Sequence, residues 1–207
     1  MKMNGINITQ SNTKLGGFIP QVNLPPIITC RENCPCASLC YARKGNFAYA
    51  NVKESHRENL EAYRADANNF FETIKDFLTS GMVIYKYFRW HSSGDIVDAR
   101  YFEGMVEVAK AVPYTKFLAF TKKFEIVNDY LDAGNKLPEN LHVVFSAWDK
   151  DFKVDNPYRL PMTYVSFKDK SKNTEIPLLA IPCTGKCDKC LACWSLHNGQ
   201  SVVFKQH

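Results

Sequence analysis

The sequence contains no apolar run that approaches the roughly 20 residues of a membrane-spanning helix. Its first ten residues, MKMNGINITQ, lack the basic and apolar regions of a secretory signal. A Gly-rich phosphate-binding loop, a nucleophile elbow and internal repeats are also absent. We therefore expect a cytoplasmic protein with no membrane association, and neither a phosphate-loop nucleotide site nor a serine-hydrolase site.

The excess of positive charge is small. Lysine and arginine number 26 against 21 aspartate and glutamate residues, which gives a formal net charge of +5. The densest basic pieces, Lys122-Lys123 and Lys168 to Lys172, are short. Scattered charge of this kind favours solubility, so a nucleic-acid partner would need a local basic patch.

The length of 207 residues and the hydrophobic fraction of 45% fit a single globular domain over residues 1–207. The first 25 residues are rich in Asn, Gly and Pro and are expected to form an irregular leading segment. Hydrophobic periodicity predicts helices over 48–80, 99–112 and 124–131, with Asp66 as an N-cap and Gly81 as a stop signal. Short apolar runs predict strands over 27–29, 82–88, 116–120, 142–147, 163–167 and 176–181.

Strands that alternate with helices indicate parallel strands joined by crossovers. About six strands are too few for an eight-unit barrel, which typically needs roughly 250 residues. We expect an α/β fold: a partial (β/α) barrel of mostly parallel strands, or the related open sheet. Such sheets bind ligands at the carboxyl ends of their strands. Because Cys30 follows the first predicted strand and Cys183 the last, the cysteine-rich segments 30–40 and 183–194 are both expected at this rim.

All eight cysteines fall into two tight groups. The second group, Cys183, Cys187, Cys190 and Cys193, has spacings of three, two and two residues. Successive Cys-x-x-Cys steps wrap around one compact core, as in ferredoxin-type cluster loops. Structural zinc usually takes two such knuckles a dozen or more residues apart. The spacing favours a [4Fe-4S] cluster, with zinc as the alternative; two disulfides are a third reading, but cytosolic thiols stay reduced.

The first group, Cys30, Cys34, Cys36 and Cys40, is denser. Its residues are also predicted metal ligands, which would give two iron–sulfur clusters in all. We expect Cys34 and Cys36, which are separated by one residue, to point to opposite sides, so the group could supply only three ligands. Three ligands would leave a coordination position open, and an open position distinguishes catalytic from structural metal centres.

Three segments carry a resemblance to a known family. They are the cysteine loop ending Cys40-Tyr41-Ala42-Arg43, the segment Arg89-Trp90-His91-Ser92-Ser93-Gly94-Asp95, and the run from Cys187 to Trp194. With these pieces the chain resembles the gene product 88 domain family of phages and prophages. The resemblance implies a phage source and hence the cytoplasm of a host cell.

More remotely, the chain is similar to radical S-adenosylmethionine enzymes. Those enzymes place a cluster-binding cysteine loop after the first strand of a partial barrel, so this likeness implies S-adenosylmethionine as a further cofactor. Their pattern is Cys-x-x-x-Cys-x-x-Cys. The first cysteine group departs from it, whereas Cys183, Cys187 and Cys190 match it at the other end of the chain.

Polar residues that follow predicted strands are the other candidates. His91, Ser93 and Asp95 are the candidate catalytic residues, because a His and a carboxylate at the rim would bind a substrate, hold a cofactor's amine or ligate a metal. The alternative is that Ser93, Gly94 and Asp95 only turn the chain and cap a helix. Lys122 and Trp148 are candidate cofactor-binding residues, with Lys122 facing an anion and Trp148 shielding a cluster from water.

Three functions remain open. The leading one is a phage-type iron–sulfur protein with redox or radical S-adenosylmethionine chemistry, which would act on a small-molecule substrate or with a redox partner. A second is a zinc-stabilised module that binds nucleic acid or a host protein through its many aromatics, which make up 13% of residues. A third is an electron-transfer protein with no substrate. The sequence leaves open whether the protein is an enzyme.

Overall fold

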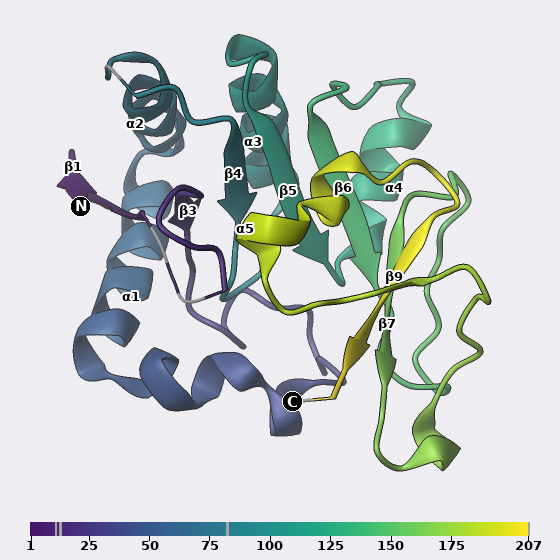
Figure 1. Ribbon diagram of the computed structural model, residues 1–207. Helices are drawn as coiled ribbons and strands as arrows, with labels where there is room; N and C mark the ends of the chain where they lie inside the picture. The colour runs from purple at the N-terminus through teal and green to yellow at the C-terminus, as the bar shows by residue number, and fades with distance from the viewer. Residues whose placement is uncertain (11, 13, 82, 207) are drawn as a thin grey trace.

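The fold is built on one open sheet, with its helices distributed unequally over the two faces (Figure 1). The computed structural model describes residues 1–10, 12, 14–81 and 83–206. Within them the strand order is β1-β2-β3-β4-β5-β6-β7-β9-β8. Neighbours from β3 to β8 pair in parallel, and β1 and β2 pair antiparallel at one edge. The strands are β1 (Lys2–Met3), β2 (Ile6–Thr9), β3 (Gln21–Val22), β4 (Tyr87–Trp90), β5 (Lys116–Thr121), β6 (Leu141–Ser146), β7 (Met162–Ser166), β8 (Ile181–Pro182) and β9 (Ser201–Lys205).

The predicted α/β class with mostly parallel strands is confirmed. The sheet has nine strands within the described residues, more than the six expected, and its two edges are β1 and β8. Because those edges do not pair with each other, the strands do not close into a barrel.

Four helices cover one face of the sheet and bury most of the core there (Figure 1). Their apolar residues recur at helical spacing, and Phe70, Ile74 and Phe102 are fully buried. The Asp66 carboxylate accepts a hydrogen bond from the Asn69 amide at 3.0 Å and caps α2, as the sequence predicted. The three predicted helical regions are thereby confirmed as α1 (Ala50–Ala65), α2 (Ala67–Thr79), α3 (Ala99–Ala111) and α4 (Phe124–Asp132).

A second, smaller core lies on the other face of the sheet. It is covered by α5 (Cys187–Cys190) and the 3-10 turn η5 (Ala192–Ser195), which cross in front of the strands in Figure 1. Trp194 is 1% exposed, and its Nε1 donates to the Phe88 carbonyl at 3.0 Å. Burial of such a ring contributes roughly 1.5–3 kcal/mol. The second cysteine segment is therefore anchored on the face of the sheet.

The prediction of an irregular leading segment with a first strand over 27–29 is wrong. Strands β1, β2 and β3 lie within the first 25 residues, and residues 27–29 form a turn. Ile27 has φ 71°, and the Thr29 hydroxyl donates to the Pro25 carbonyl at 2.8 Å. The paired prolines Pro25 and Pro26 explain the difference, because neither has an amide hydrogen to give to a sheet.

Other strand boundaries also shift. The strand predicted over 82–88 begins only at Tyr87; its first position, residue 82, lies outside the described residues. Of the stretch 176–181 only Ile181 enters β8, and Leu178 and Leu179 are exposed. The sequence analysis missed β9, which pairs with both β7 and β8.

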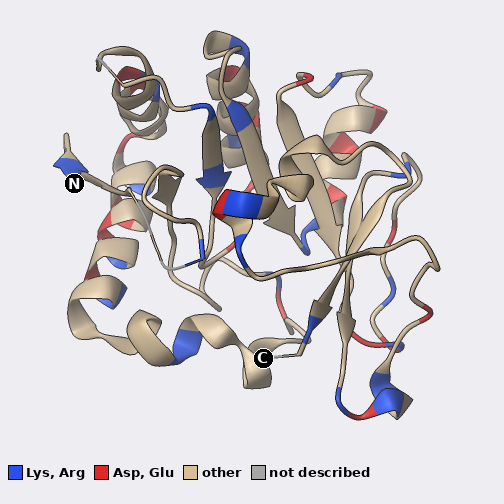
Figure 2. Ribbon diagram, viewed as in Figure 1, with Lys and Arg blue, Asp and Glu red and all other residues tan. Residues whose placement is uncertain are grey.

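Charged residues are dispersed over helices, strands and loops (Figure 2). No one element in this view gathers the net charge of +5. Within the described residues, no helix is both long enough and apolar enough to span a membrane.

Candidate metal centres

The first cysteine group lies in a series of tight turns. The Ala37 amide donates to the Cys34 carbonyl and the Leu39 amide to the Cys36 carbonyl, each at 3.0 Å. Cys34 Sγ lies 3.3 Å from Cys36 Sγ. The expectation that the two side chains diverge is therefore wrong. Residues i and i+2 point to the same side even on an extended backbone, and here the backbone is turned, with Cys36 at φ −89° and ψ 1°.

The thiol contacts extend from this pair to the first cysteine. The Ile27 amide donates to Cys30 Sγ at 3.3 Å. Hydrogen bonds from the Cys30 and Cys36 thiols lower the pKa of Cys34, and the same contacts raise the pKa of Cys30 and of Cys36. The charge of Cys40 reaches Cys36 as well. The group thus concentrates negative charge on one sulfur, and the thiolate is the form that binds metal.

The segment from His91 to Asp95 braces the chain that leads into this group. Asn23 Oδ1 accepts hydrogen bonds from the Ser92 and Ser93 amides at 2.8 and 3.1 Å. Ser93 Oγ donates to the Leu24 carbonyl at 3.0 Å. Ser92 and Ser93 therefore hold the segment after β4 against the residues that follow β3.

Gly94 and Asp95 complete this brace. Gly94 has φ +85°, and a Cβ there would lie 2.7 Å from both Leu24 Cβ and Thr29 Oγ1, so the close approach requires glycine. The Asp95 amide donates to Thr29 Oγ1 at 3.1 Å, and its carboxylate accepts from the Lys122 amide at 3.0 Å. Burial raises the pKa of Asp95. Its charge also reaches Cys30, so this carboxyl borders the first cysteine group.

His91 faces the helix-side core. Its Nε2 lies 2.9 Å from the Tyr101 hydroxyl, and its ring also packs near Trp90. It is 3% exposed and has φ 57°. Burial lowers the pKa of His91 to about 3, with further lowering from Arg89 and Lys123. The side chain is therefore neutral near pH 7 and supports α3, whereas Asp95 lies beside the cysteines.

Lys122 and Trp148, the predicted cofactor-binding residues, lie together beside the first cysteine group. Lys122 Nζ lies 5.8 Å from the centre of the Trp148 ring. The charge of Lys122 acts on both Cys34 and Cys36. Lys123 is turned elsewhere, because its Nζ donates to the Val97 carbonyl at 2.7 Å.

The second cysteine group surrounds one small cavity. The cavity has a volume of about 20 Å³, and its lining includes Trp194 and Val202 together with all four cysteines of the group. The Gly185 amide donates to Cys183 Sγ at 3.4 Å. Leu191 adopts φ 52°, which ends α5 and turns the chain back toward the last of these cysteines. The cavity exceeds the 10–15 Å³ that a single water needs.

Burial dominates the electrostatics of the second group. It raises the pKa of Cys187, and it raises the pKa of Cys193 to about 12. The Arg89 guanidinium opposes both shifts. These thiols therefore stay protonated unless a cation replaces the proton.

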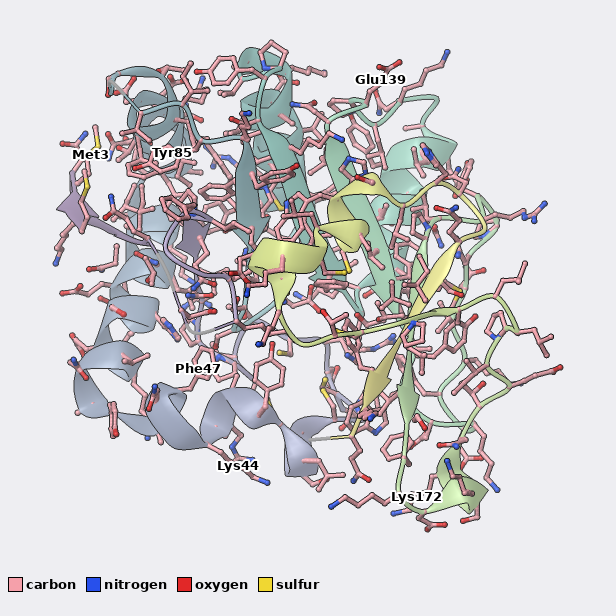
Figure 3. The ribbon with its side chains drawn as sticks, viewed as in Figure 1. Met3, Lys44, Phe47, Tyr85, Glu139 and Lys172 are labelled. Atoms are coloured by element: carbon pink, nitrogen blue, oxygen red, sulfur yellow. The ribbon has the colours of Figure 1, made fainter. Side chains whose placement is uncertain are left out.

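Arg89 also connects the two groups in space. The charges of Arg89, Cys36 and Cys40 all reach Tyr41, the residue that follows the first group. In Figure 3, side-chain sulfur atoms lie in the centre of this face, between the α5–η5 segment and the chain that leads to Lys44. The first group lies beside Asp95 and Lys122, which follow β4 and β5, whereas the second covers the face of the sheet above β5 and β6 instead of the rim.

The cysteines are free thiols, with no bond between any two of the eight. Within the described part of the chain, no group of three or more His, Cys, Asp or Glu side chains is already arranged to hold a metal ion. The donor types nevertheless suit a thiolate-bound metal, because four cysteines line one cavity and the thiols of Cys30, Cys34 and Cys36 contact one another in a chain.

A comparison of the sequence with protein-family models gives a match. A family model described as Gene product 88 covers residues 3–196. The chain belongs to the gene product 88 family. No curated protein and no solved structure matches it. The family resemblance drawn from the sequence is confirmed, and the comparisons lend no support to the likeness to radical S-adenosylmethionine enzymes.

In this gene product 88 chain, the two cysteine segments that carried the resemblance both contact β4 or the residues directly after it. The Tyr41 hydroxyl, after the first cysteine group, donates to the Ser92 carbonyl at 2.6 Å. Trp194, at the end of the second group, donates to the Phe88 carbonyl at the other end of the same short strand, β4. Strand β4 and the residues that follow it thus link the two cysteine groups.

Sequence reasoning did not single out Arg89, which this gene product 88 chain places between the two groups. A signal was present: an arginine inside the apolar stretch Tyr-Phe-Arg-Trp of a central strand. Arginine is seldom fully buried without a partner. The buried charge of Arg89 therefore calls for a negatively charged partner.

Proposed function

We propose that this protein binds metal through both cysteine groups, and that it is an iron–sulfur protein with redox chemistry at the carboxyl rim of the sheet. The observation that carries the proposal is the single cavity bordered by Cys183, Cys187, Cys190 and Cys193. Four thiols around one space form a complete ligand set for a cluster. The amide of Gly185, directed at Cys183 Sγ, is the kind of hydrogen bond that tunes such a centre.

The first cysteine group would provide the ligands of a second metal centre. Its most acidic thiol, Cys34, contacts Cys36, and Lys122 adds positive charge on the same side. An anionic thiolate centre is stabilised by such a cation. Asp95 borders the group as a candidate proton carrier, because its raised pKa allows it to exchange a proton nearer neutrality.

A zinc-stabilised binding module remains the second candidate, and one distance favours it. Two thiolates on one tetrahedral zinc lie about 3.8 Å apart, given Zn–S bonds of about 2.3 Å. Cys34 Sγ and Cys36 Sγ, at 3.3 Å, are closer to this geometry than to a cubane in which each iron takes one cysteine. We do not extend the proposal to S-adenosylmethionine chemistry, because the first group lacks the required spacing.

Metal analysis of oxygen-free material tests the proposal. The full chain would be purified anaerobically and assayed for iron, acid-labile sulfide and zinc. We expect iron and sulfide, with the share bound by the second group lost in Cys187→Ser. The matched control is Lys189→Ala, which changes an exposed residue of the same helix and should leave the metal content unchanged. A colourless protein with stoichiometric zinc alone would overturn the iron–sulfur proposal and favour the binding module.

A further inference from the structure

Arg89 lies on the cysteine-bearing face of the sheet. In β4, Phe88 and Trp90 belong to the helix-side core, and Tyr87 packs against the opposite core. Alternation along a strand places Arg89 on the same side as Tyr87. Its guanidinium lies 4.9 Å from the centre of the Phe120 ring, and that ring packs against the second core, as Cys187 and Cys193 do.

The guanidinium has no anionic partner among the described residues. Arg89 is 7% exposed, and its Nε is buried without a hydrogen-bond acceptor. The ion pairs found in the described ranges involve other residues, all of them near the surface. A buried charge without a counter-ion is strongly unfavourable. Contact with the Phe120 ring compensates only part of this cost.

Metal-bound cysteines would supply the missing negative charge. Four thiolates carry four negative charges, and a divalent ion or a [4Fe-4S] core of charge +2 neutralises only two of them. The centre would keep a net charge of −2 on a partly buried site. Lys186 and Lys189 are exposed and screened by water. Lys14, whose charge also acts on Cys187, is only half-buried, so Arg89 is the buried cation beside this group.

We propose that Arg89 is the internal counter-cation of the second cysteine group, a positioning residue whose guanidinium pairs with the thiolates only when they hold metal. The inference rests on the proposed function, because it requires that this group binds a metal. It explains why a charged residue is retained inside an apolar strand. It also gives the family segment 89–95 an electrostatic role in addition to its bracing role.

Cobalt binding tests the inference directly. Co²⁺ alone is the probe, and thiolate-to-cobalt charge-transfer absorption reports the site. The titration would use the full chain with Cys34→Ser, which removes the central thiol of the first group. Arg89→Met and Arg89→Gln remove the charge and are expected to weaken Co²⁺ binding about 10–100-fold, the usual effect of losing an outer-shell partner. Arg89→Lys keeps the charge and should retain most of the affinity.

The outcomes separate the inference from the proposed function. If Arg89→Gln binds Co²⁺ as tightly as the parent chain, the counter-cation role is wrong and the metal site stands. If the parent shows no thiolate-to-cobalt absorption, the proposed metal site fails, and the counter-cation role fails with it. Circular dichroism checks that each variant folds. If Arg89→Met does not fold, the comparison of Arg89→Gln with Arg89→Lys still tests whether the charge at position 89 affects Co²⁺ affinity. Equal losses in those two variants would count against a charge effect.

Discussion

Cys34 Sγ and Cys36 Sγ, on residues separated by one position in the sequence, lie 3.3 Å apart. The turn between them directs both sulfurs to one side, where Cys30 and Lys122 also act on Cys34. Cys34 Sγ is therefore the central sulfur of the first group, because the thiols of both Cys30 and Cys36 contact it.

Replacement of that central sulfur should remove one centre and spare the other. In Cys34→Ser, we expect metal bound by the first group to be lost, because the contact chain from Cys30 to Cys36 is broken. Cys193→Ser should instead remove the metal of the second group. Metal-to-protein ratios of the two variants check this. Loss of all metal in both variants would show that the groups form one shared centre.

Cys34 should also be the most reactive thiol of the metal-free, reduced protein at low pH. Hydrogen bonds from Cys30 and Cys36 lower its pKa, so Cys34 stays a thiolate well below the ordinary thiol pKa of about 8.5. Burial raises the pKa of Cys193 to about 12. At pH 6, iodoacetamide should label Cys34 at least about tenfold faster than Cys193, as measured by peptide mass spectrometry. The exposed Cys190 controls for access, and faster labelling there than at Cys34 would contradict the prediction.

Gly94→Ala should destabilise the protein more than Gly134→Ala. Both glycines have positive φ, +85° and +82°, so each substitution carries a left-handed strain of about 1–2 kcal/mol. Only at Gly94 would the new Cβ also meet Leu24 and Thr29, which adds about 1–3 kcal/mol for overpacking. Urea unfolding of the two variants measures the difference. Equal free energies of unfolding would mean that the close approach at Gly94 is relieved without cost.

His91 should make the protein sensitive to acid. Its pKa falls from an ordinary 6.5 to about 3 in the folded state, so below pH 6.5 the unfolded chain takes up a proton that the folded protein refuses. The free energy of unfolding should therefore fall as the pH drops from 6.5 toward 3, by at most about 1.4 kcal/mol per pH unit from this group.

His91→Asn should flatten this part of the stability profile, since asparagine does not titrate and tolerates the left-handed backbone of position 91. Loss of the hydrogen bond with Tyr101 should cost about 1 kcal/mol at pH 7. Urea unfolding between pH 4 and pH 7 measures both effects. His197→Asn changes an exposed histidine and serves as the control. An unchanged slope in His91→Asn would assign the acid sensitivity to other groups.

The helices could be predicted because their signals are local. Asp66 caps α2, and Phe70 and Ile74 recur at helical spacing, so neighbours in the sequence are also neighbours in the helix. Two of the strands that the sequence missed or misplaced are very short. Gln21–Val22 and Ile181–Pro182 have two residues each and exist only because they pair with distant segments.

The sequence by itself determined the α/β class, the family and the grouping of the cysteines, because periodicity and spacing are properties of nearby residues. Only the tertiary structure decided that the second group covers the face of the sheet and that Arg89 lies between the groups. These relations depend on turns and crossovers that bring distant segments together. No local pattern of residues specifies where such segments meet.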